Sequence, residues 1–214
     1  MKKSVAVLGL GKYGRSLSEN LFRLGADVLA VDCSEEVIGD FADKCTSAVC
    51  ANLSNEDEVT SLGLKNMDIV VVAMGRNLAA SILSVTVAKE QGVPWVVAKA
   101  SSDRMATILK KVGADKILDP EGNGGERSAR ILMSSDFKDF YKLDDNMFMI
   151  EMSPKSDWIG KNLIELDLRN KLNVNIVAVR HDGKPLCFVD PKKPFTEDDL
   201  LLVVAEKDKI TSLL

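Results

Sequence analysis

Short aliphatic and β-branched runs alternate with amphipathic stretches through the first 118 residues, and this alternation limits the possible folds more than any other feature of the chain. The apolar runs predict strands at Ser4–Leu8, Asp27–Asp32, Ala48–Ala51, Asp68–Met74, Trp95–Lys99 and Lys116–Leu118. The stretches between them predict helices at Tyr13–Leu24, Glu35–Lys44, Ser54–Leu62, Asn77–Gln91 and Ser102–Val112. Strands joined by helices are typical of a parallel sheet, because a parallel connection must return to the starting end of the sheet. We therefore expect an α/β domain with an open, doubly wound parallel sheet.

A glycine motif, Gly9-Leu10-Gly11-Lys12-Tyr13-Gly14, follows the first predicted strand directly and opens the first predicted helix. In such a motif the first glycine permits a tight turn, the second lets the backbone approach a diphosphate, and the third lets the helix pack on the strand. The helix N-terminus adds free N–H groups and a partial positive charge. The motif predicts a Rossmann-type nucleotide-binding domain, with Gly9, Gly11, Lys12, Tyr13 and Gly14 at the phosphates.

Asp32 ends the second predicted strand, 18 residues after Gly14. A carboxylate there can accept hydrogen bonds from both ribose hydroxyls and would repel a 2′-phosphate. The alternative is that the motif is only a tight turn and that Asp32 caps the next helix.

Other strand ends meet at the same edge of the predicted sheet, where ligands of open α/β sheets bind. Gly75 is a candidate because a side chain there would crowd the crevice. Lys99 is either a counter-charge for a phosphate or an ordinary exposed lysine. Asn52 is a further candidate, although its position also suits the start of a helix. Ser54, with Asp57 three residues later, resembles a capping box.

The pattern changes after about residue 136. Strands are predicted at Asp139–Leu143, Met147–Met152, Val174–Arg180, Pro185–Val189 and Leu200–Ala205, with helices at Leu163–Lys171 and Glu206–Leu214. This is a small α+β module. We expect domains at 1–135 and 136–214, joined through a helix at Glu126–Ser134. The preceding glycine-rich run, Gly122–Gly125, is predicted to be a loop and a flexible joint.

Composition excludes several classes of protein. The net charge is −4 and the basic residues are scattered, so a nucleic-acid partner is not expected. The four cysteines have no CxxC spacing and there is one histidine, which does not suit a zinc site. With no export signal, we expect buried, reduced thiols in a cytoplasmic protein. The longest uncharged apolar runs have about six residues, and a membrane helix needs about 20.

Residues for catalysis are missing. A dehydrogenase needs a positioned acid or base, but His181 falls in a predicted hairpin turn of the second module. No Ser–His or Cys–His arrangement has a suitable context. We therefore expect a nucleotide that is bound without being reacted, and a protein that is not an enzyme.

The whole chain resembles the cytosolic gating subunits of Trk/Ktr-type potassium uptake systems, which combine a regulator-of-potassium-conductance (RCK) domain with a C-terminal companion. The resemblance rests on Val7–Gly14, Leu29–Asp32, Val72–Gly75, Val97–Ala100, Gly113–Asp115, Ile159–Lys161, Leu166–Arg169, Ile176–Val179 and Asp198–Leu201. It implies homodimers that form a ring, expected to be an octamer, on the cytoplasmic face of a membrane-embedded potassium channel or transporter subunit.

The resemblance also implies ligands. In the Ktr branch the nucleotide is ATP or ADP, and in the Trk branch NAD(H). Lys12 stands where the Ktr branch commonly has an arginine that contacts the terminal phosphate. A lysine keeps the positive charge but cannot form the two parallel hydrogen bonds of an arginine guanidinium group. Glu121 matches a glutamate that helps hold a divalent cation beside the γ-phosphate, or it is a solvated loop carboxylate.

A second ligand site is implied in the C-terminal module. Its residues follow the spacing with which family members bind cyclic di-AMP between two paired modules: Leu163, Ile164, Asp167, Arg169, Asn175, Ile176 and Val177. Arg169 would meet a phosphate and the aliphatic residues would pack on adenine. The alternative is that the aliphatic residues belong to the core of the module.

Two rival functions remain open. One is an NAD-dependent oxidoreductase, which shares the glycine motif. The other is a sensor subunit of a different cation transporter, which shares the domain pair.

Overall fold

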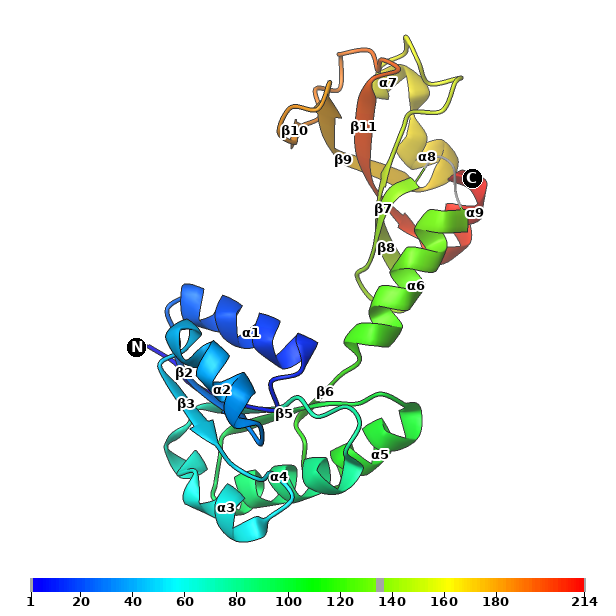
Figure 1. Ribbon diagram of the computed structural model, residues 1–214. Coiled ribbons are helices and arrows are strands. Elements are labelled where there is room, and N and C mark those ends of the chain that lie inside the picture. Colours follow the sequence, from blue (N-terminus) through cyan, green and yellow to red (C-terminus); the bar gives the residue numbers. More distant parts are fainter. Residues whose placement is uncertain (1, 134–136, 214) are drawn as a thin grey trace. The chain divides into compact units, whose positions relative to one another are not determined.

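The computed structural model describes residues 2–133 and 137–213 (Figure 1). The chain divides into two compact units, Met1–Gly122 and Asn123–Leu214, and each is described by itself below. The boundary expected from the sequence, between residues 135 and 136, lies outside the described residues.

The first unit is built on a parallel sheet with strand order β3-β2-β1-β4-β5-β6 (Figure 1). The strands are β1 (Ser4–Leu8), β2 (Asp27–Asp32), β3 (Ser47–Cys50), β4 (Ile69–Val72), β5 (Trp95–Lys99) and β6 (Lys116–Leu118). β1 pairs with β2 on one side and β4 on the other, so the direction of winding reverses there. Open α/β sheets bind ligands beyond the strand ends at such a reversal. The doubly wound fold expected from the sequence is confirmed.

Helices cover both faces of this sheet (Figure 1). They are α1 (Lys12–Arg23), α2 (Glu35–Phe41), α3 (Glu56–Ser61), α4 (Leu78–Glu90) and α5 (Asp103–Lys111). Val5 and Val7 of β1 pack in the core beneath α1 and α2, whereas Ala6 and Leu8 pack in the core beneath α3, α4 and α5. Alternate residues of a strand point to opposite faces, so both faces need apolar residues and the strand is apolar throughout.

Two helix ends differ from the sequence prediction. α3 is capped by Asn55, whose Oδ1 accepts hydrogen bonds from Asp57 N (2.9 Å) and Glu58 N (3.4 Å), so the predicted capping box at Ser54 is wrong. Ser54 instead accepts a hydrogen bond at its hydroxyl from Asn77 Nδ2. The helix predicted to reach Lys44 ends at Phe41 and continues as a 3₁₀ turn, η1 (Ala42–Lys44). A second 3₁₀ turn, η2 (Leu64–Asn66), precedes β4.

The glycine-rich run is helical. α6 extends over Pro120–Met133, so the predicted loop at Gly122–Gly125 is wrong. Asp119 explains the difference, because its Oδ1 accepts a hydrogen bond from Gly122 N (2.8 Å) and caps the first turn. A Cβ on Gly122 would lie 2.0 Å from the Asp119 carboxylate, so glycine is needed there for this cap to form. The division between the two units falls inside this helix.

The second unit contains an antiparallel sheet with strand order β10-β9-β11-β8-β7. The strands are β7 (Phe137–Lys142), β8 (Met147–Met152), β9 (Val174–His181), β10 (Cys187–Phe188) and β11 (Asp199–Glu206). The helices are α7 (Leu163–Leu166), α8 (Leu168–Leu172) and α9 (Lys207–Leu213). The core contains Phe140, Phe148, Trp158 and Leu201, and Ile131 of α6 packs against it. The expected α+β module is confirmed.

One predicted helix of this unit is broken in two. Asp167 takes a left-handed conformation (φ 49°, ψ 44°) between α7 and α8. α7 begins with a capping box, in which Asn162 Oδ1 accepts from Ile164 N and Glu165 N while Glu165 Oε2 accepts from Asn162 N. This cap and the turn at Asp167 fix the position of the short helices over the sheet.

The expectation of buried thiols holds only in part. Cys45 is buried, whereas Cys33, Cys50 and Cys187 are exposed, and all four are free. Cys45 packs beside Phe41 in the core of the first unit.

An ion pair links α6 to β7 within the second unit. Arg127 donates to both carboxylate oxygens of Asp139, from Nε to Oδ1 at 2.7 Å and from Nη2 to Oδ2 at 2.5 Å. The Tyr141 hydroxyl donates to the same Oδ2. The hydrogen bonds from Arg127, with that from Tyr141, lower the pKa of Asp139 from 3.8 to about 2.

Asp139→Asn should lower the free energy of unfolding of this unit near pH 7 by about 2 kcal/mol, the equivalent of the pKa difference. Because the folded pKa lies below the unfolded one, this stabilisation is complete above about pH 4 and is lost as the pH falls toward 2. Urea unfolding at several pH values in a Trp95→Phe background, followed by Trp158 fluorescence, measures the difference. A difference that does not shrink in acid would contradict this assignment.

Candidate functional site

The glycine motif forms the turn from β1 into α1, and two of its glycines are required by packing. Gly9 has φ +98°, a conformation that favours glycine. A Cβ on Gly14 would lie 1.9 Å from the carbonyl oxygen of Gly9, so the helix can approach the turn only because this side chain is absent. Gly11 faces open space, with no atom within 4 Å of a Cβ placed on it. The turn is therefore closely packed at Gly14 and Gly9, whereas Gly11 leaves room for another molecule to approach the backbone.

The N-terminus of α1 has no side-chain cap. Its N-cap residue is Gly11, and its first turn carries no acidic residue. The first turns of α2, α3, α4 and α5 are capped by the side chains of Ser34, Asn55, Asn77 and Ser102. The N–H groups at the start of α1 are thus left for another acceptor, and the partial positive charge of the helix end favours an anion there.

Asp32 connects the end of β2 to the glycine turn. Its Oδ2 accepts a hydrogen bond from Leu10 N at 2.7 Å, and its Oδ1 accepts from Ser34 N at 3.1 Å. The N-cap of α2 is Ser34, whose hydroxyl accepts from Val37 N, so the alternative role of Asp32 as that cap is wrong. Each carboxylate oxygen keeps a second lone pair, which is what a pair of ribose hydroxyls needs.

Lys99 is not an ordinary exposed lysine. Its side chain is 11% exposed at the end of β5, and its Nζ lies 2.5 Å from Glu121 Oε1 in the first turn of α6. The same Nζ lies 5.7 Å from the centre of the Tyr13 ring, and it would be 3.3 Å from a Cβ on Gly75. A buried cation therefore lies between the glycine turn and the end of β4.

The charges of this cluster influence one another. The hydrogen bond from Lys99 lowers the pKa of Glu121, which keeps the carboxylate ionised. Burial, together with the negative charge of Glu121, raises the pKa of Tyr13, which keeps its hydroxyl protonated. The cluster is a neutralised ion pair with a buried ammonium group.

The structure brings most of the predicted residues of this domain to one edge of the sheet: Gly9, Gly11, Lys12, Tyr13, Gly14, Asp32, Gly75, Lys99 and Glu121. Lys12 is exposed in the first turn of α1. Asn52 lies beyond β3, where its Oδ1 accepts from Ser54 N (3.0 Å) and forms a local turn. Sequence reasoning missed Ser101, whose hydroxyl donates to the carbonyl of Gly75 at 2.6 Å and holds the end of β4.

The described side chains offer few ligands for a metal ion. Within residues 2–133 and 137–213, no three histidine, cysteine, aspartate or glutamate side chains gather closely enough to hold one. The Glu121 carboxylate is paired with Lys99. Glu121 could serve a cation only as one ligand among several, with the remaining ligands supplied by a bound molecule.

The residues predicted for a second ligand site differ in their exposure. Ile164 is 61% exposed, and Arg169 and Asn175 are also exposed. Leu163 is half-buried against the core. Ile176 is 6% exposed and packs in the core of the module. Asn175 and Ile176 are consecutive in β9 and must point to opposite faces.

The comparisons with known proteins cover both units. Residues 5–120 match the TrkA-N domain and residues 147–214 match the TrkA-C domain. The chain belongs to the TrkA-N/TrkA-C family. Within this family it is 35% identical over 208 residues to the Ktr system potassium uptake protein A of Bacillus subtilis, with 97% of this chain and 94% of the relative covered. It is 33% identical over 211 residues to the Ktr system potassium uptake protein C of the same organism, with 99% and 96% covered.

A solved structure supports the fold. The RCK domain of GsuK matches with a TM-score of 0.68 and 15% sequence identity, and the match covers 100% of this chain and 47% of that one. At this identity the likeness shows the fold alone. In the described part of this TrkA-family chain, no helix is long and apolar enough to span a membrane.

The packing at Gly14 can be tested without a ligand. Gly14→Ala should destabilise the first unit by about 1–3 kcal/mol, the usual effect of overpacking, because the new Cβ meets the Gly9 carbonyl. Gly11→Ala is the matched control and should cost less than about 1 kcal/mol, the scale of an N-cap effect. Equal losses of unfolding free energy in the two variants, measured by chemical denaturation, would show that a Cβ at position 14 is tolerated as well as one at position 11.

Proposed function

We propose that this protein is a nucleotide-responsive regulatory subunit of a potassium uptake system and that it carries out no reaction on the nucleotide. The observation that carries the proposal is the 33–35% identity to two Ktr system potassium uptake proteins, which extends through both units. The cluster at the carboxyl edge of the parallel sheet supplies the ligand site of such a subunit. Its partner is a membrane-embedded potassium channel or transporter subunit, on whose cytoplasmic face homodimers of this chain assemble into a ring.

An adenine nucleotide suits the site. The uncapped N-terminus of α1 takes the diphosphate, and Gly11 leaves room for the phosphate oxygens to approach the backbone. The free lone pairs of Asp32 accept the ribose hydroxyls. ATP and ADP are favoured, because Lys12 and Lys99 place two cations near a terminal phosphate. NAD(H) remains the alternative, since the same turn and carboxylate suit a dinucleotide.

The Lys99–Glu121 ion pair makes the site responsive. A phosphate that reaches Lys99 competes with Glu121 for the ammonium group, and Glu121 belongs to the first turn of α6. Further along the same helix, Ile131 packs against the core of the second unit. Displacement of Glu121 would therefore act on a helix that extends into both units. The released carboxylate could then help to hold a divalent cation, with phosphate oxygens as the other ligands.

The free energy required is modest. A ligand shifts a two-state equilibrium only by the difference between its affinities for the two states. A shift from 1:99 to 99:1 takes about 5.5 kcal/mol, or about 0.7 kcal/mol per site if eight sites of an octameric ring act together. Allosteric couplings of about 1–3 kcal/mol are ordinary, so small differences at each site suffice.

We also propose a second ligand site in the second unit: Ile164, Arg169 and Asn175 contribute to a cyclic di-AMP site between two paired modules. All three side chains are exposed, and Ile164 and Arg169 lie on consecutive short helices. Ile176 would support this surface from the core, and Leu163 would do so from its half-buried position.

Ligand identity is tested by mass spectrometry of the nucleotide that co-purifies with the protein, followed by calorimetric titration with ATP, ADP and NADH. Asp32→Ala should weaken binding about tenfold or more, the effect of losing hydrogen bonds to a charged group. Asp57→Ala is a control at an exposed carboxylate of the same unit. No heat from any adenine nucleotide in a folded sample would contradict the proposal. Turnover of NADH with a carbonyl substrate would favour the oxidoreductase instead.

The ion pair is tested with Glu121→Gln. In the absence of divalent cations this variant should bind ATP about tenfold more tightly than the wild type, because the Lys99 ammonium group no longer has an internal carboxylate partner. Lys99→Met should bind ATP less tightly than either. Adding Mg²⁺ should then favour the wild type over Glu121→Gln if the carboxylate holds a cation. Equal ATP affinities of the wild type and Glu121→Gln would exclude the competition.

A further inference from the structure

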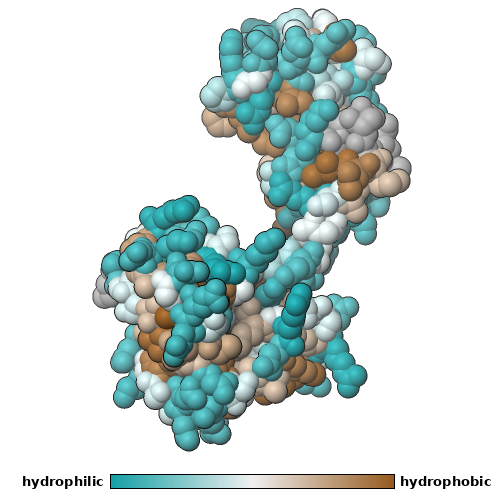
Figure 2. Space-filling view, viewed as in Figure 1, coloured by the Kyte–Doolittle hydropathy of each residue, from teal (hydrophilic) through white to brown (hydrophobic). Residues whose placement is uncertain are grey.

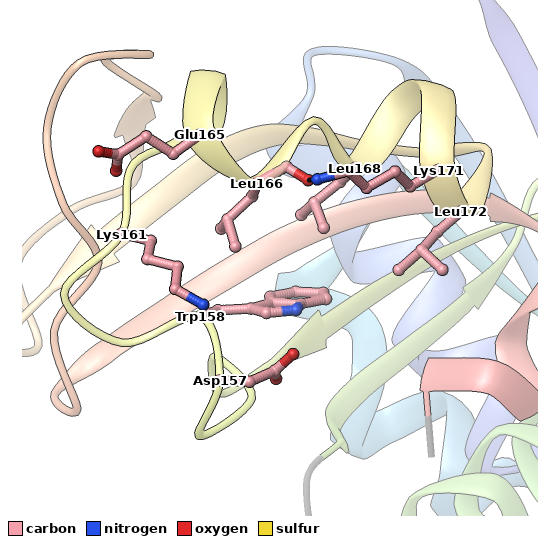
Figure 3. A pocket seen from close by; sticks show the side chains of 8 residues that line it. All are labelled: Asp157, Trp158, Lys161, Glu165, Leu166, Leu168, Lys171 and Leu172. Carbon is pink, nitrogen blue, oxygen red and sulfur yellow. Dashed lines mark hydrogen bonds between the residues drawn. The ribbon is translucent and has the colours of Figure 1, made fainter.

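A cavity of about 510 Å³ opens in the second unit, between the segment at 157–161 and the helices α7 and α8 (Figure 3). This is within the usual range for small-molecule sites. Four lining residues are apolar and four are charged: Trp158, Leu166, Leu168 and Leu172, with Asp157, Lys161, Glu165 and Lys171. None of these residues was predicted as a site from the sequence, and the proposed nucleotide site lies in the other unit.

Trp158 gives the cavity an apolar floor with one polar atom. The residue is 3% exposed, and in Figure 3 the three leucine side chains point toward its ring. The indole N–H has no hydrogen-bond acceptor among the described residues. This nitrogen is not one of the buried side-chain atoms that lack a partner, so it is accessible from the cavity and can donate to an acceptor there.

Two charged side chains beside Trp158, those of Lys161 and Asp157, do not pair with each other. In the described part of the chain, neither the Lys161 ammonium nor the Asp157 carboxylate has a hydrogen-bond or ion-pair partner, although both line the cavity. In Figure 3 the Lys161 ammonium lies near one end of Trp158, and Asp157 lies below its ring. One free cation and one free anion, held apart, match a molecule with a charge of each sign.

The other two charged residues are already partly used. Lys171 Nζ donates to the carbonyl of Leu166 at 3.0 Å, which leaves it two donors. Glu165 Oε2 accepts from Asn162 N at 2.9 Å in the capping box, and its carboxylate points away from the indole (Figure 3). The groups that can still bind a ligand beside Trp158 are therefore the ammonium groups of Lys161 and Lys171, the indole N–H and the Asp157 carboxylate.

We propose that this cavity binds an apolar α-amino acid. The ligand's carboxylate accepts hydrogen bonds from the indole N–H and the lysine ammonium groups. Its ammonium group pairs with Asp157, and its apolar side chain packs on the leucines. This site lies apart from the glycine turn in sequence and does not require nucleotide binding in the first unit.

The test compares L-leucine with two analogues, each of which lacks one of its charged groups. 4-Methylpentanoate lacks the ammonium group, and 3-methylbutylamine lacks the carboxylate. Calorimetric titration of the full chain should give binding of L-leucine at least about tenfold tighter than either half, as expected when one charged hydrogen-bonding group is lost. In a Trp95→Phe background, where Trp158 is the remaining tryptophan, L-leucine should change the fluorescence. No binding of L-leucine, or equal binding of the three compounds, would overturn the proposal.

Two exposed side chains allow matched variants. Asp157→Asn should weaken L-leucine about tenfold and leave 4-methylpentanoate unchanged, whereas Lys161→Gln should weaken both. Asp198→Asn and Lys192→Gln are controls at exposed residues of the same unit that do not line the cavity. Thermal melts followed by circular dichroism establish that each variant is folded. L-leucine affinity that is the same in Asp157→Asn as in its control would exclude the assigned role of the carboxylate.

Discussion

The close approach of α1 to the glycine turn is the interaction on which the first unit's site depends. Because Gly14 has no Cβ, the helix starts directly against the carbonyl of Gly9, at the end of the central strand β1. This position directs the uncapped helix end toward the edge at which the winding of the sheet reverses. Asp32 then ties the turn to β2 through Leu10 N. A larger residue at position 14 would displace all of these groups together.

The sheets of the two units are covered differently and leave space for ligands in different places. The parallel sheet is covered on both faces, and its strands converge on one edge where charged and polar groups collect. The antiparallel sheet of the second unit packs its core against short helices, so the space it offers lies beneath α7 and α8. α7 begins there at the capping box of Asn162 and Glu165, and the left-handed Asp167 separates it from α8.

Much of this arrangement could be predicted from the sequence, because it follows from short-range patterns. The alternation of apolar runs predicts every strand of the parallel sheet, and the spacing of the glycines places the turn and Asp32. The Lys99–Glu121 pair could not be derived, since it joins elements whose proximity depends on packing. Strand periodicity places Ile176 and Asn175 on opposite faces of β9, which the ligand set implied by the resemblance did not take into account. The helix α6 was missed because glycine content predicts a loop, whereas the cap at Asp119 depends on the absence of a Cβ at Gly122.

The composition of α6 has a thermodynamic consequence. Each glycine inside a helix costs about 1 kcal/mol relative to alanine, and Gly122, Gly124 and Gly125 occupy its first two turns. Gly124 and Gly125 face open space, so no neighbour demands their small size. The start of the helix is therefore weakly held, and a change at Glu121 or Asp119 can unwind it at little expense. Unwinding this segment therefore costs less free energy than unwinding a helix of the same length without glycines.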